Sequence, residues 1–480
     1  MATPIPVNRA SFTTESVIAA TGASIETGPS GACSGVVTDS RAEVAGKLFV
    51  TLSGERFDAH RFIPDVLARG AWGVVAEREV PGADAKHLFL VPCALRALGE
   101  LARAHRQRWS GKVVTIGGSA GKTTTRAATS TLLEAIRPGR IHGTIGNLNN
   151  LIGVPMTLLG LEPQHEVAVV ELGTNQRGEV SRLAAICQAD AAVLTCIGLE
   201  HAQGLGDLDG VEAEEADLFT AMRPGSYVIG NVDDARVRRL LSSSSERGSA
   251  VCSYGEGLDA THRILSRQTL GLDRSRVRIL RSLGDAKDEI SLTTRLLGLP
   301  GALASAAALA VHDAVFGPTR DASRFEHALD RDVGEESRLK IIERSDRALF
   351  IDDCYNANPA SMRSSIAVAK ELAKARQARL CFVLGDMLEL GDLSRREHEA
   401  LADELGDAAE IVAVGSEMAA LVTRSSQQGL PVTQFSSSAE AAEYVREQSR
   451  AGDVWLIKGS RGIRLERVVA VALGGKDIAP

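Results

Sequence analysis

The stretch GGSAGKTTT, residues 117–125, decides how this chain is organised. An apolar run at residues 113–116 precedes it and predicts a strand, while residues 124–136 after it predict a helix. Small residues between a strand and a helix let backbone N–H groups surround phosphate oxygens, and the helix N-terminus adds partial positive charge. We therefore predict a phosphate-binding loop, in which Lys122 reaches the terminal phosphates and the Thr123 hydroxyl is a ligand of Mg²⁺.

The spacing of this loop departs from the strict P-loop pattern, because Ile116 stands five residues before Gly121 where that pattern has glycine. What remains is the shorter form Gly-Ser-x-Gly-Lys-Thr. The alternative is an ordinary turn rich in small residues, but Gly-Lys-Thr at the start of a helix after a buried strand favours phosphate binding. The residues predicted to bind ATP here are Gly118, Ser119, Ala120, Gly121, Lys122, Thr123 and Thr124.

The bulk composition is that of a soluble globular protein of several domains. The chain has 480 residues, 44% of them hydrophobic and 24% charged, and its net charge of −7 comes from mixed signs. This balance argues against general binding to nucleic acid or to anionic membranes. The 7 cysteines are scattered, which is typical of buried thiols in a reducing compartment. Residues 1–10 lack a signal-peptide pattern, and the apolar residues 296–311 predict a core helix, so we expect a cytoplasmic protein without membrane insertion.

Apolar runs alternate with helical segments along most of the chain, which predicts an α/β protein of three domains. Residues 1–106 predict a small N-terminal α/β domain, residues 107–316 a central, doubly wound, mostly parallel sheet of P-loop type, and residues 317–480 a Rossmann-like α/β domain. Within the central domain, we expect the serine-rich residues 241–249 to form a loop. We expect residues 255–294 to form a small sheet packed onto this domain.

Polar side chains follow several of the predicted strands. Glu171 follows the run at 167–170, Glu200 and His201 come after the run at 191–195, and acidic residues follow the run at 227–229. Each residue alone is read more simply as a helix cap or loop group. Because the carboxyl ends of parallel strands meet at one edge of a sheet, the set together predicts a Mg²⁺-nucleotide site. The segment TIGNLNNLIGVP, residues 144–155, is either a turn or a surface for a polar substrate.

Three further motifs lie after predicted strands of the third domain: DDCYNANP at 352–359, GDMLELG at 385–391 and KGSRG at 458–462. With these motifs, the loop at 117–125 and the ELG at 171–173, the chain resembles the Mur ligases of bacterial cell-wall synthesis over nearly its whole length. Within that family it resembles the branch that adds D-alanyl-D-alanine. The DSR at 39–41 and LFV at 48–50 resemble the UDP-binding N-terminal domain of the family.

The resemblance implies an ATP-dependent ligase that joins UDP-N-acetylmuramoyl-tripeptide to D-alanyl-D-alanine through an acyl phosphate, with Mg²⁺, as a monomer. It implies catalytic roles for Lys122, Glu171 and His201, and nucleotide contacts for Arg338 and Asp353. The residues implied to bind the other substrates are Ser40, Arg41, Thr144, Asn149, Asn150, Asn356 and Asn358. The implied metal ligands are Thr123, Glu171, His201 and Glu215.

Three positions depart from the family pattern. Glu215 stands where the family usually carries a lysine that is carbamylated, unless residues 212–215 are only a solvated helix face. Residues 299–305 lack the family's His-Asn…Asn pattern for adenine, and Arg126 replaces a lysine of many relatives. Two alternatives therefore stay open, namely a Mur-ligase-like paralogue that forms an amide in another pathway, and a catalytically weak protein that binds the UDP-peptide.

Overall fold

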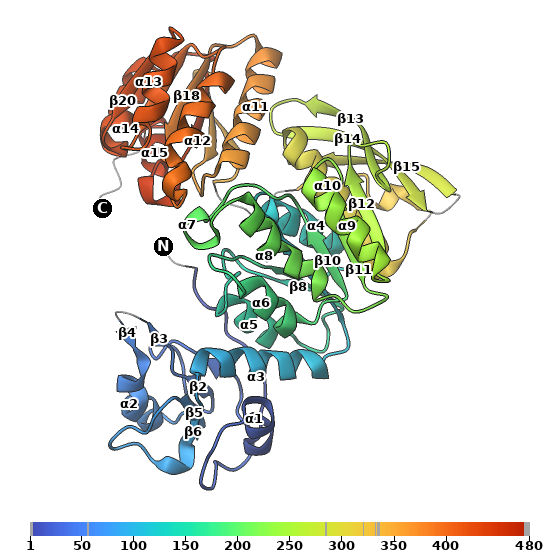
Figure 1. Cartoon of the computed structure of the whole chain (residues 1–480), viewed down its shortest axis with the longest axis vertical. Coiled ribbons are helices and arrows are strands. Elements are labelled where there is room, and N and C mark those ends of the chain that lie inside the picture. Colours follow the sequence, from blue (N-terminus) through green and yellow to red (C-terminus); the bar gives the residue numbers. More distant parts are fainter. Residues whose placement is uncertain are drawn as a thin grey trace.

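The computed structural model describes residues 3–474 except residues 55, 56, 284, 285, 320, 332 and 334–336. Three α/β regions follow one another along the long axis of the molecule, each built around its own sheet (Figure 1). The phosphate-loop region lies in the middle, with the N-terminal and C-terminal regions at opposite ends. The predicted three-part α/β architecture is confirmed, while the domain boundaries at residues 106 and 316 stay predictions.

The N-terminal region contains a parallel sheet in the order β1-β2-β5-β6. Its strands are β1 (Val36–Val37), β2 (Leu48–Val50), β5 (Gly73–Ala76) and β6 (Leu88–Leu90), and β3 (Ser53–Gly54) and β4 (Phe57–Asp58) pair beside it. Its helices are α1 (Thr14–Thr21), α2 (Ile63–Ala68) and α3 (Ala94–Arg108). One hydrophobic cluster runs from Phe12 and Leu98 into Val154 and Leu183, so α3 joins this region firmly to the next.

The central region is built on a nine-stranded sheet of the described residues, in the order β15-β14-β13-β12-β11-β10-β7-β9-β8. The strands are β7 (Lys112–Gly117), β8 (Ile141–Gly143), β9 (Val167–Glu171), β10 (Ala191–Leu194), β11 (Tyr227–Asn231), β12 (Ala250–Gly255), β13 (His262–Leu270), β14 (Arg274–Leu283) and β15 (Ala286–Thr294). The helices are α4 (Lys122–Ile136), α5 (Gly153–Leu159), α6 (Glu179–Cys187), α7 (Ala202–Leu205), α8 (Leu208–Thr220), α9 (Ala235–Glu246) and α10 (Gly298–Phe316).

This central sheet is mixed, and that corrects part of the sequence prediction. Strands β7 to β12 pair in parallel, but β13, β14 and β15 pair antiparallel with one another. We expected residues 255–294 to form a separate small sheet. Instead β13 pairs in parallel with β12, Tyr254 beside His262, so these strands continue the same sheet.

The loop predicted at residues 241–249 is also wrong over most of its length, because α9 continues to Glu246. Asp234 caps this helix, and Val237, Leu241 and Ser244 lie buried along one face of it. The serines are accommodated because their hydroxyls bond to carbonyls one turn back, as Ser244 does to the Leu240 carbonyl at 2.8 Å. Serine-rich composition alone therefore misled the prediction.

Helix α10 is the predicted core helix. It is long and apolar enough to pass for a membrane span, but 78% of its most apolar window is buried inside the protein. It packs on the central sheet beside α4, with alanines such as Ala306 and Ala307 allowing close approach. Its composition is thus explained by packing within the protein core.

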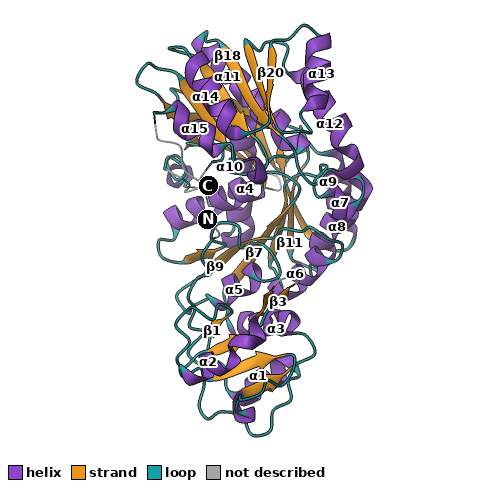
Figure 2. Ribbon diagram, turned by 90° about the vertical axis from the view of Figure 1, so that its left-hand side faces the viewer, coloured by secondary structure: helices purple, strands orange, loops and turns teal. Residues whose placement is uncertain are grey.

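The C-terminal region holds a six-stranded sheet of the described residues, in the order β16-β17-β21-β18-β19-β20, with only β16 antiparallel. Its strands are β16 (Lys340–Glu343), β17 (Leu349–Asp353), β18 (Leu380–Gly385), β19 (Glu410–Val414), β20 (Val432–Phe435) and β21 (Val454–Lys458). Its helices are α11 (Pro359–Arg376), α12 (Ser394–Leu401), α13 (Ala419–Gln427), α14 (Ser438–Gln448) and α15 (Glu466–Ala472). Helices cover both faces (Figure 2). The motifs at the carboxyl ends of β17, β18 and β21 border the central region.

Candidate active site

The loop between β7 and α4 has the geometry that its sequence predicts. Gly118 and Gly121 have φ values of +118° and +81°, a backbone conformation that favours glycine. A Cβ on Gly118 would lie 2.2 Å from the Thr195 hydroxyl, so no larger residue fits there. The Thr195 hydroxyl donates to the Ala120 carbonyl at 2.6 Å, and Ser119 Oγ accepts from the Gly198 N–H at 2.9 Å. The loop is therefore braced by the segment that follows β10.

A cavity of about 430 Å³ opens in front of this loop, between the central and C-terminal regions. It brings together residues that are far apart in the sequence. The predicted site residues on its wall are Ser119, Ala120, Gly121, Lys122, Thr123, Thr124, Asn149, Asn150, Glu171, His201, Arg338, Asp353, Asn356 and Asn358. Most of the predicted nucleotide and substrate residues thus share one space.

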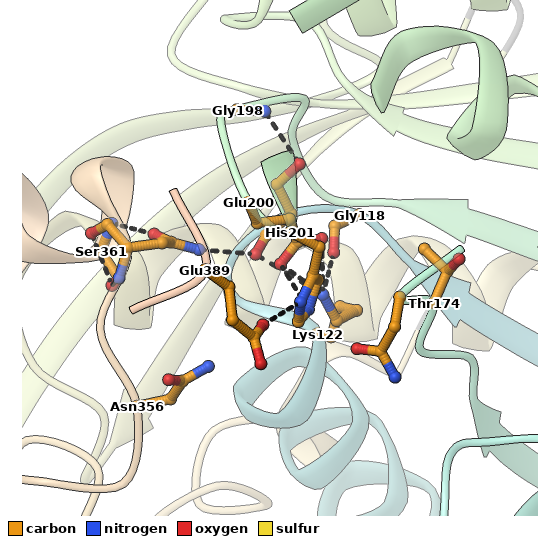
Figure 3. A network of polar contacts seen from close by, with 12 residues as sticks. Gly118, Lys122, Thr174, Gly198, Glu200, His201, Asn356, Ser361 and Glu389 are labelled. Carbon is orange, nitrogen blue, oxygen red and sulfur yellow. Dashed lines mark hydrogen bonds and ion pairs between the residues drawn. The ribbon is translucent and has the colours of Figure 1, made fainter. Parts of the chain in front are cut away.

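Lys122 lies at the centre of a buried charge cluster (Figure 3). Its ammonium group is 3.1 Å from Glu200 Oε1 and 3.3 Å from Glu200 Oε2, and it also bonds to the Gly118 carbonyl. Burial alone would lower the pKa of Lys122, but the attraction of Glu200, Glu215 and Glu171 outweighs it and raises this pKa. Burial raises the pKa of Glu200 to about 8 against the attraction of Lys122. The lysine is charged and held where a terminal phosphate would replace its carboxylate partner.

Glu171, at the end of β9, is held by four neighbours. The Thr123 hydroxyl donates to Oε1 at 3.0 Å, Asn149 Nδ2 donates to the same oxygen at 2.9 Å, and Arg126 Nε lies 3.3 Å from Oε2. Thr144 lies behind the carboxylate, where its hydroxyl accepts from the Glu171 backbone N–H at 2.9 Å. Thr144 does not line the cavity, so the structure gives it a supporting position.

Glu215 on α8 faces the phosphate loop, and the three glutamates of this helix have separate surroundings. Glu212 pairs with Arg236 and Arg239 at the surface, while Glu214 accepts from the N–H groups of Gly178 and Val180 at 2.6 and 2.8 Å. Glu215 is 1% exposed. A solvated helix face is therefore the wrong interpretation for Glu214 and Glu215, and Glu212 is itself partly buried by its arginine partners.

The Glu215 carboxylate is incompletely bonded. A Cβ built on Gly117 would lie 3.0 Å from its Oε2, and that oxygen has no hydrogen-bond partner in the part of the chain that the structure describes. Burial raises the pKa of Glu215 to about 7, against the opposing effects of Lys122 and of the Gly118 backbone N–H. A buried oxygen without a donor is costly unless a ligand, a water or a cation completes it.

The donor set suits a divalent cation bound with nucleotide. In the part of the chain that the structure describes, the carboxylates of Glu171, Glu200 and Glu215 gather near the cationic side chains of Lys122 and Arg126. Mg²⁺ prefers carboxylate and hydroxyl oxygens and completes its shell with phosphate and water. Among the residues that the structure describes, no group of three or more His, Cys, Asp or Glu side chains is arranged to hold a metal alone. The protein oxygens therefore require phosphate or water to complete such a site.

His201 lies beside this cluster and pairs across the regional boundary. Its Nδ1 is 2.5 Å from Glu389 Oε2, and its Nε2 is 4.0 Å from Glu200 Oε2. Burial lowers the pKa of His201 against the attraction of Glu389. His201 is thus close to the predicted metal oxygens but bonded directly to the C-terminal region.

The C-terminal region brings its own polar groups to the cavity. Asp353 accepts from Ser365 Oγ and from Lys458 Nζ, both at 2.6 Å, and Arg338 stacks over the Tyr355 ring at 4.3 Å. Asn358 caps α11 and donates to the Ser119 carbonyl at 3.0 Å, which joins this region to the phosphate loop.

A second cavity of about 320 Å³ adjoins the first at Glu200, His201 and Asn356. Its remaining polar wall includes Asn147, Glu389 and Arg461. Arg461 therefore offers a guanidinium to the carboxylate of a small molecule, while Glu389 is bonded to His201.

Two of the sequence predictions concern residues outside these cavities or a motif that the chain lacks. Ser40 and Arg41 line neither cavity, and Arg41 pairs with Asp39 in an exposed loop of the N-terminal region. At the far end of the first cavity, Leu297, Pro300 and Gly301 form the wall, so the missing His-Asn…Asn pattern leaves no side-chain amide from this stretch.

The sequence prediction placed Glu200 in the set for a Mg²⁺-nucleotide site, from its place beside His201 after a strand, but did not identify its bond to Lys122. It gave no individual role to Glu389, Lys458 and Arg461, which also shape the site. Glu389, Lys458 and Arg461 lie within recognised motifs. Their partners depend on how the two regions pack, so no local sequence pattern identifies those partners.

Comparison with known proteins agrees with this site. Family models match residues 116–312, as the Mur ligase middle domain, and residues 337–461, as the Mur ligase glutamate ligase domain. UDP-N-acetylmuramoyl-tripeptide–D-alanyl-D-alanine ligase of Escherichia coli is 32% identical over 90% of this chain and 92% of its own length. The enzyme of the same name from Bacillus subtilis is 30% identical over 91% and 92%.

Solved structures give the same result. A crystal structure of MurF from Acinetobacter baumannii has a TM-score of 0.85 at 28% identity, covering 98% of this chain and 100% of that one. MurF ligase from Thermotoga maritima, solved in complex with ADP, has a TM-score of 0.79 at 25% identity, covering 92% and 97%. The match in sequence and fold extends over all three regions, including the two that border the first cavity, and this chain belongs to the Mur ligase family.

Proposed function

We propose that this chain is an ATP-dependent ligase that adds D-alanyl-D-alanine to UDP-N-acetylmuramoyl-tripeptide during peptidoglycan precursor synthesis. The observation that carries the proposal is the junction of two cavities at His201, one around the Lys122 loop and the other between Glu389 and Arg461. A phosphate-transfer site and a site for a small molecule that carries a carboxylate thus share a wall. The relatives that match over about 90% of the chain bear the name of this activity.

The nucleotide end of the mechanism follows from the phosphate loop. Backbone N–H groups of residues 118–124 bind the phosphates, and Lys122 exchanges its bond with Glu200 for the terminal phosphate. Arg338 and Asp353 hold the nucleoside from the C-terminal side, since both line the far part of the same cavity. These contacts position the phosphate for in-line transfer.

The metal in this proposal is Mg²⁺, held by Thr123 and Glu171, with Glu215 and His201 bordering a second position. Bound there, the cation would neutralise charge that develops on the transferred phosphoryl group. Glu215 supplies its own carboxylate where relatives are expected to use a carbamylated lysine, so this chain needs no carbon dioxide for the ligand. Asn149 and Arg126 keep the Glu171 carboxylate oriented.

The acceptor end lies in the second cavity. The tripeptide carboxylate attacks the γ-phosphate to give an acyl phosphate and ADP, and the dipeptide amine then displaces phosphate from the acyl carbon. Arg461 offers its guanidinium to the dipeptide carboxylate, while Asn356 and Asn358 line the path between the two cavities. Thr144, Asn150, Ser40 and Arg41 are proposed to serve the UDP-linked substrate, Thr144 through Glu171.

We further infer that the protein works as a monomer in the cytoplasm. The catalytic residues of both cavities come from regions that are joined within one chain, and its cysteines are free thiols in the described structure. A reducing compartment that contains ATP and nucleotide-linked sugars suits these features.

The test is phosphate release from ATP by the purified chain with UDP-N-acetylmuramoyl-tripeptide, with and without D-alanyl-D-alanine. The proposal predicts release that requires the dipeptide, and none from the Lys122→Gln variant. Release only with a different amine would instead support a paralogue of another pathway. No release with any acceptor, combined with tight binding of the UDP-peptide, would support a binding protein.

A further inference from the structure

Glu389 and His201 are held against each other in unusual backbone conformations. Glu389, in the loop after β18, has a φ of +65°, and His201, before α7, has a φ of +49°. Left-handed conformations are uncommon for residues other than glycine, and they persist where the surrounding structure imposes them. Here the two residues meet across the boundary between two regions, although they are 188 positions apart in the chain.

The loop that carries Glu389 is held by hydrogen bonds to other residues of the C-terminal region. The Met387 backbone N–H donates to His398 Nε2 at 3.0 Å, and the Leu388 N–H donates to Ser460 Oγ at 3.0 Å. Met387 and Leu390, on either side, are buried. The Glu389 carbonyl in addition accepts from the Gln203 N–H at 3.3 Å. Glu389 is therefore presented to His201 by a rigid loop.

The imidazole stands at the wall that both cavities share. With Nδ1 at 2.5 Å from the Glu389 carboxylate, the ring presents Nε2 to the side where Glu200 and Lys122 lie (Figure 3). A histidine whose Nδ1–H is bonded to a carboxylate keeps the tautomer with a free lone pair on Nε2. Its Nε2 is then available to accept a proton or to bind a cation, and the orientation of the ring is set.

We propose that Glu389 is a positioning residue, whose carboxylate fixes the ring and tautomer of His201 only when the C-terminal region is docked on the central one. The inference rests on the proposed function for its kinetic part. Docking then does more than enclose the substrates, because the same movement that delivers Asn358 to the Ser119 carbonyl also orients His201. An undocked molecule would have a mobile imidazole beside Lys122.

The first test compares Glu389→Ala and Glu389→Gln with Asp392→Asn, a control in the same loop whose exposed carboxylate does not contact His201 in the described structure. Loss of a group that orients a ligand typically costs 10–100-fold, so Glu389→Ala should lower kcat by about 10-fold or more, with KM values changed less than about 3-fold. Glu389→Gln keeps an acceptor oxygen, so its kcat should lie between those of wild type and Glu389→Ala. The kcat of the Asp392→Asn control should match wild type. A raised KM for D-alanyl-D-alanine with kcat unchanged would overturn the proposal and assign Glu389 to the substrate amine.

The second test does not depend on activity. ¹⁵N NMR of imidazole-labelled protein with ADP and Mg²⁺, assigned with His201→Asn, should show the Nδ1-protonated tautomer in wild type and a mixture of tautomers in Glu389→Ala. An unchanged His201 spectrum in Glu389→Ala would overturn the positioning role even in a chain that proved to have another activity. If wild type released no phosphate but the spectra changed as expected, only the proposed function would fail.

Discussion

Two clusters of buried charge lie in the central region, and they are balanced differently. In the Asp313 cluster, the Asp313 carboxylate on α10 accepts from His262 and His312, each at 3.0 Å, and pairs with Arg281 at 3.1 Å. Arg281 also pairs with Asp288 and donates to the Thr319 carbonyl at 2.7 Å. Burial alone would raise the pKa of Asp313, but these partners outweigh it and hold the pKa well below its usual range.

The Lys122 cluster has the opposite balance. Its carboxylates outnumber its cations, burial raises the pKa of Glu200 to about 8 and of Glu215 to about 7, and Glu215 Oε2 has no partner in the described structure. Burial is therefore no guide to the role of a charge. A cluster that satisfies itself stabilises the fold, whereas one that carries excess charge and an unbonded atom is completed by a ligand.

The largest expected effect is on catalysis at Lys122. Lys122→Gln removes the charge that meets the terminal phosphate, and kcat/KM should fall by about 10³-fold or more, by analogy with the loss of one preorganised charge in other enzymes. Phosphate release is the measurement. Asp313→Asn, assayed where it is fully folded, should keep wild-type activity, and a comparable loss in that variant would remove the distinction between the clusters.

Asp313→Asn should act on stability. Removing one partner of a buried charge network typically costs about 3 kcal/mol, or roughly 150-fold in the folding equilibrium. Urea unfolding measures it. Asp288→Asn, which affects the same guanidinium but at a position 41% exposed, should cost much less. Equal losses in the two variants would show that burial of Asp313 is not what matters.

Glu215→Gln should change activity and stability in opposite directions, because Glu215 is both a proposed metal ligand and a buried carboxylate. It removes an oxygen ligand, which should lower activity by about 10–100-fold, and it removes a buried carboxylate with a raised pKa, which should raise the Tm of the ligand-free protein. Glu212→Gln, at a partly buried position of the same helix that pairs with Arg236 and Arg239 away from Lys122, should do neither. Glu215→Lys should make activity depend on added bicarbonate. A silent Glu215→Gln would contradict the proposed metal site.

The smallest expected effect is on pH dependence. Because the folded-state pKa of Asp313 is lowered, its stabilisation is fully present above the unfolded pKa of about 3.9 and is lost as pH falls toward the folded value. The difference in unfolding free energy between wild type and Asp313→Asn should stay constant from pH 7 to pH 5 and shrink below about pH 4. A difference that grows on acidification would reverse the sign of the proposed linkage.

Much of the fold could be predicted from sequence because buried parallel strands appear as apolar runs between helical segments. The predicted strand at 113–116 lies in β7, and the run at 167–170 lies in β9. The phosphate loop was predictable because only small residues fit its turns, as the contact of Gly118 with Thr195 explains. The serine run of α9 was not, because its helix depends on a buried face that composition does not show.

The site was predicted in part for a similar reason. Glu171 and Glu215 were identified from position and resemblance, but the bond of Lys122 to Glu200 joins residues 78 positions apart, and the Glu389 bond to His201 joins separate regions. Thr144 was expected at the substrate and is found bonded to the Glu171 backbone. Such contacts depend on how sheets and regions pack, and no local spacing encodes them.

The most direct test of the unbalanced cluster is the rise in Tm that ADP produces, measured with and without Mg²⁺ for wild type, Glu215→Gln and Asp313→Asn. Binding to the folded state alone raises Tm in proportion to affinity. The proposed Mg²⁺ site predicts a Mg²⁺-dependent rise in wild type, the same rise from a lower starting Tm in Asp313→Asn, and less than half of it in Glu215→Gln. An equal Mg²⁺ response in all three proteins would contradict it.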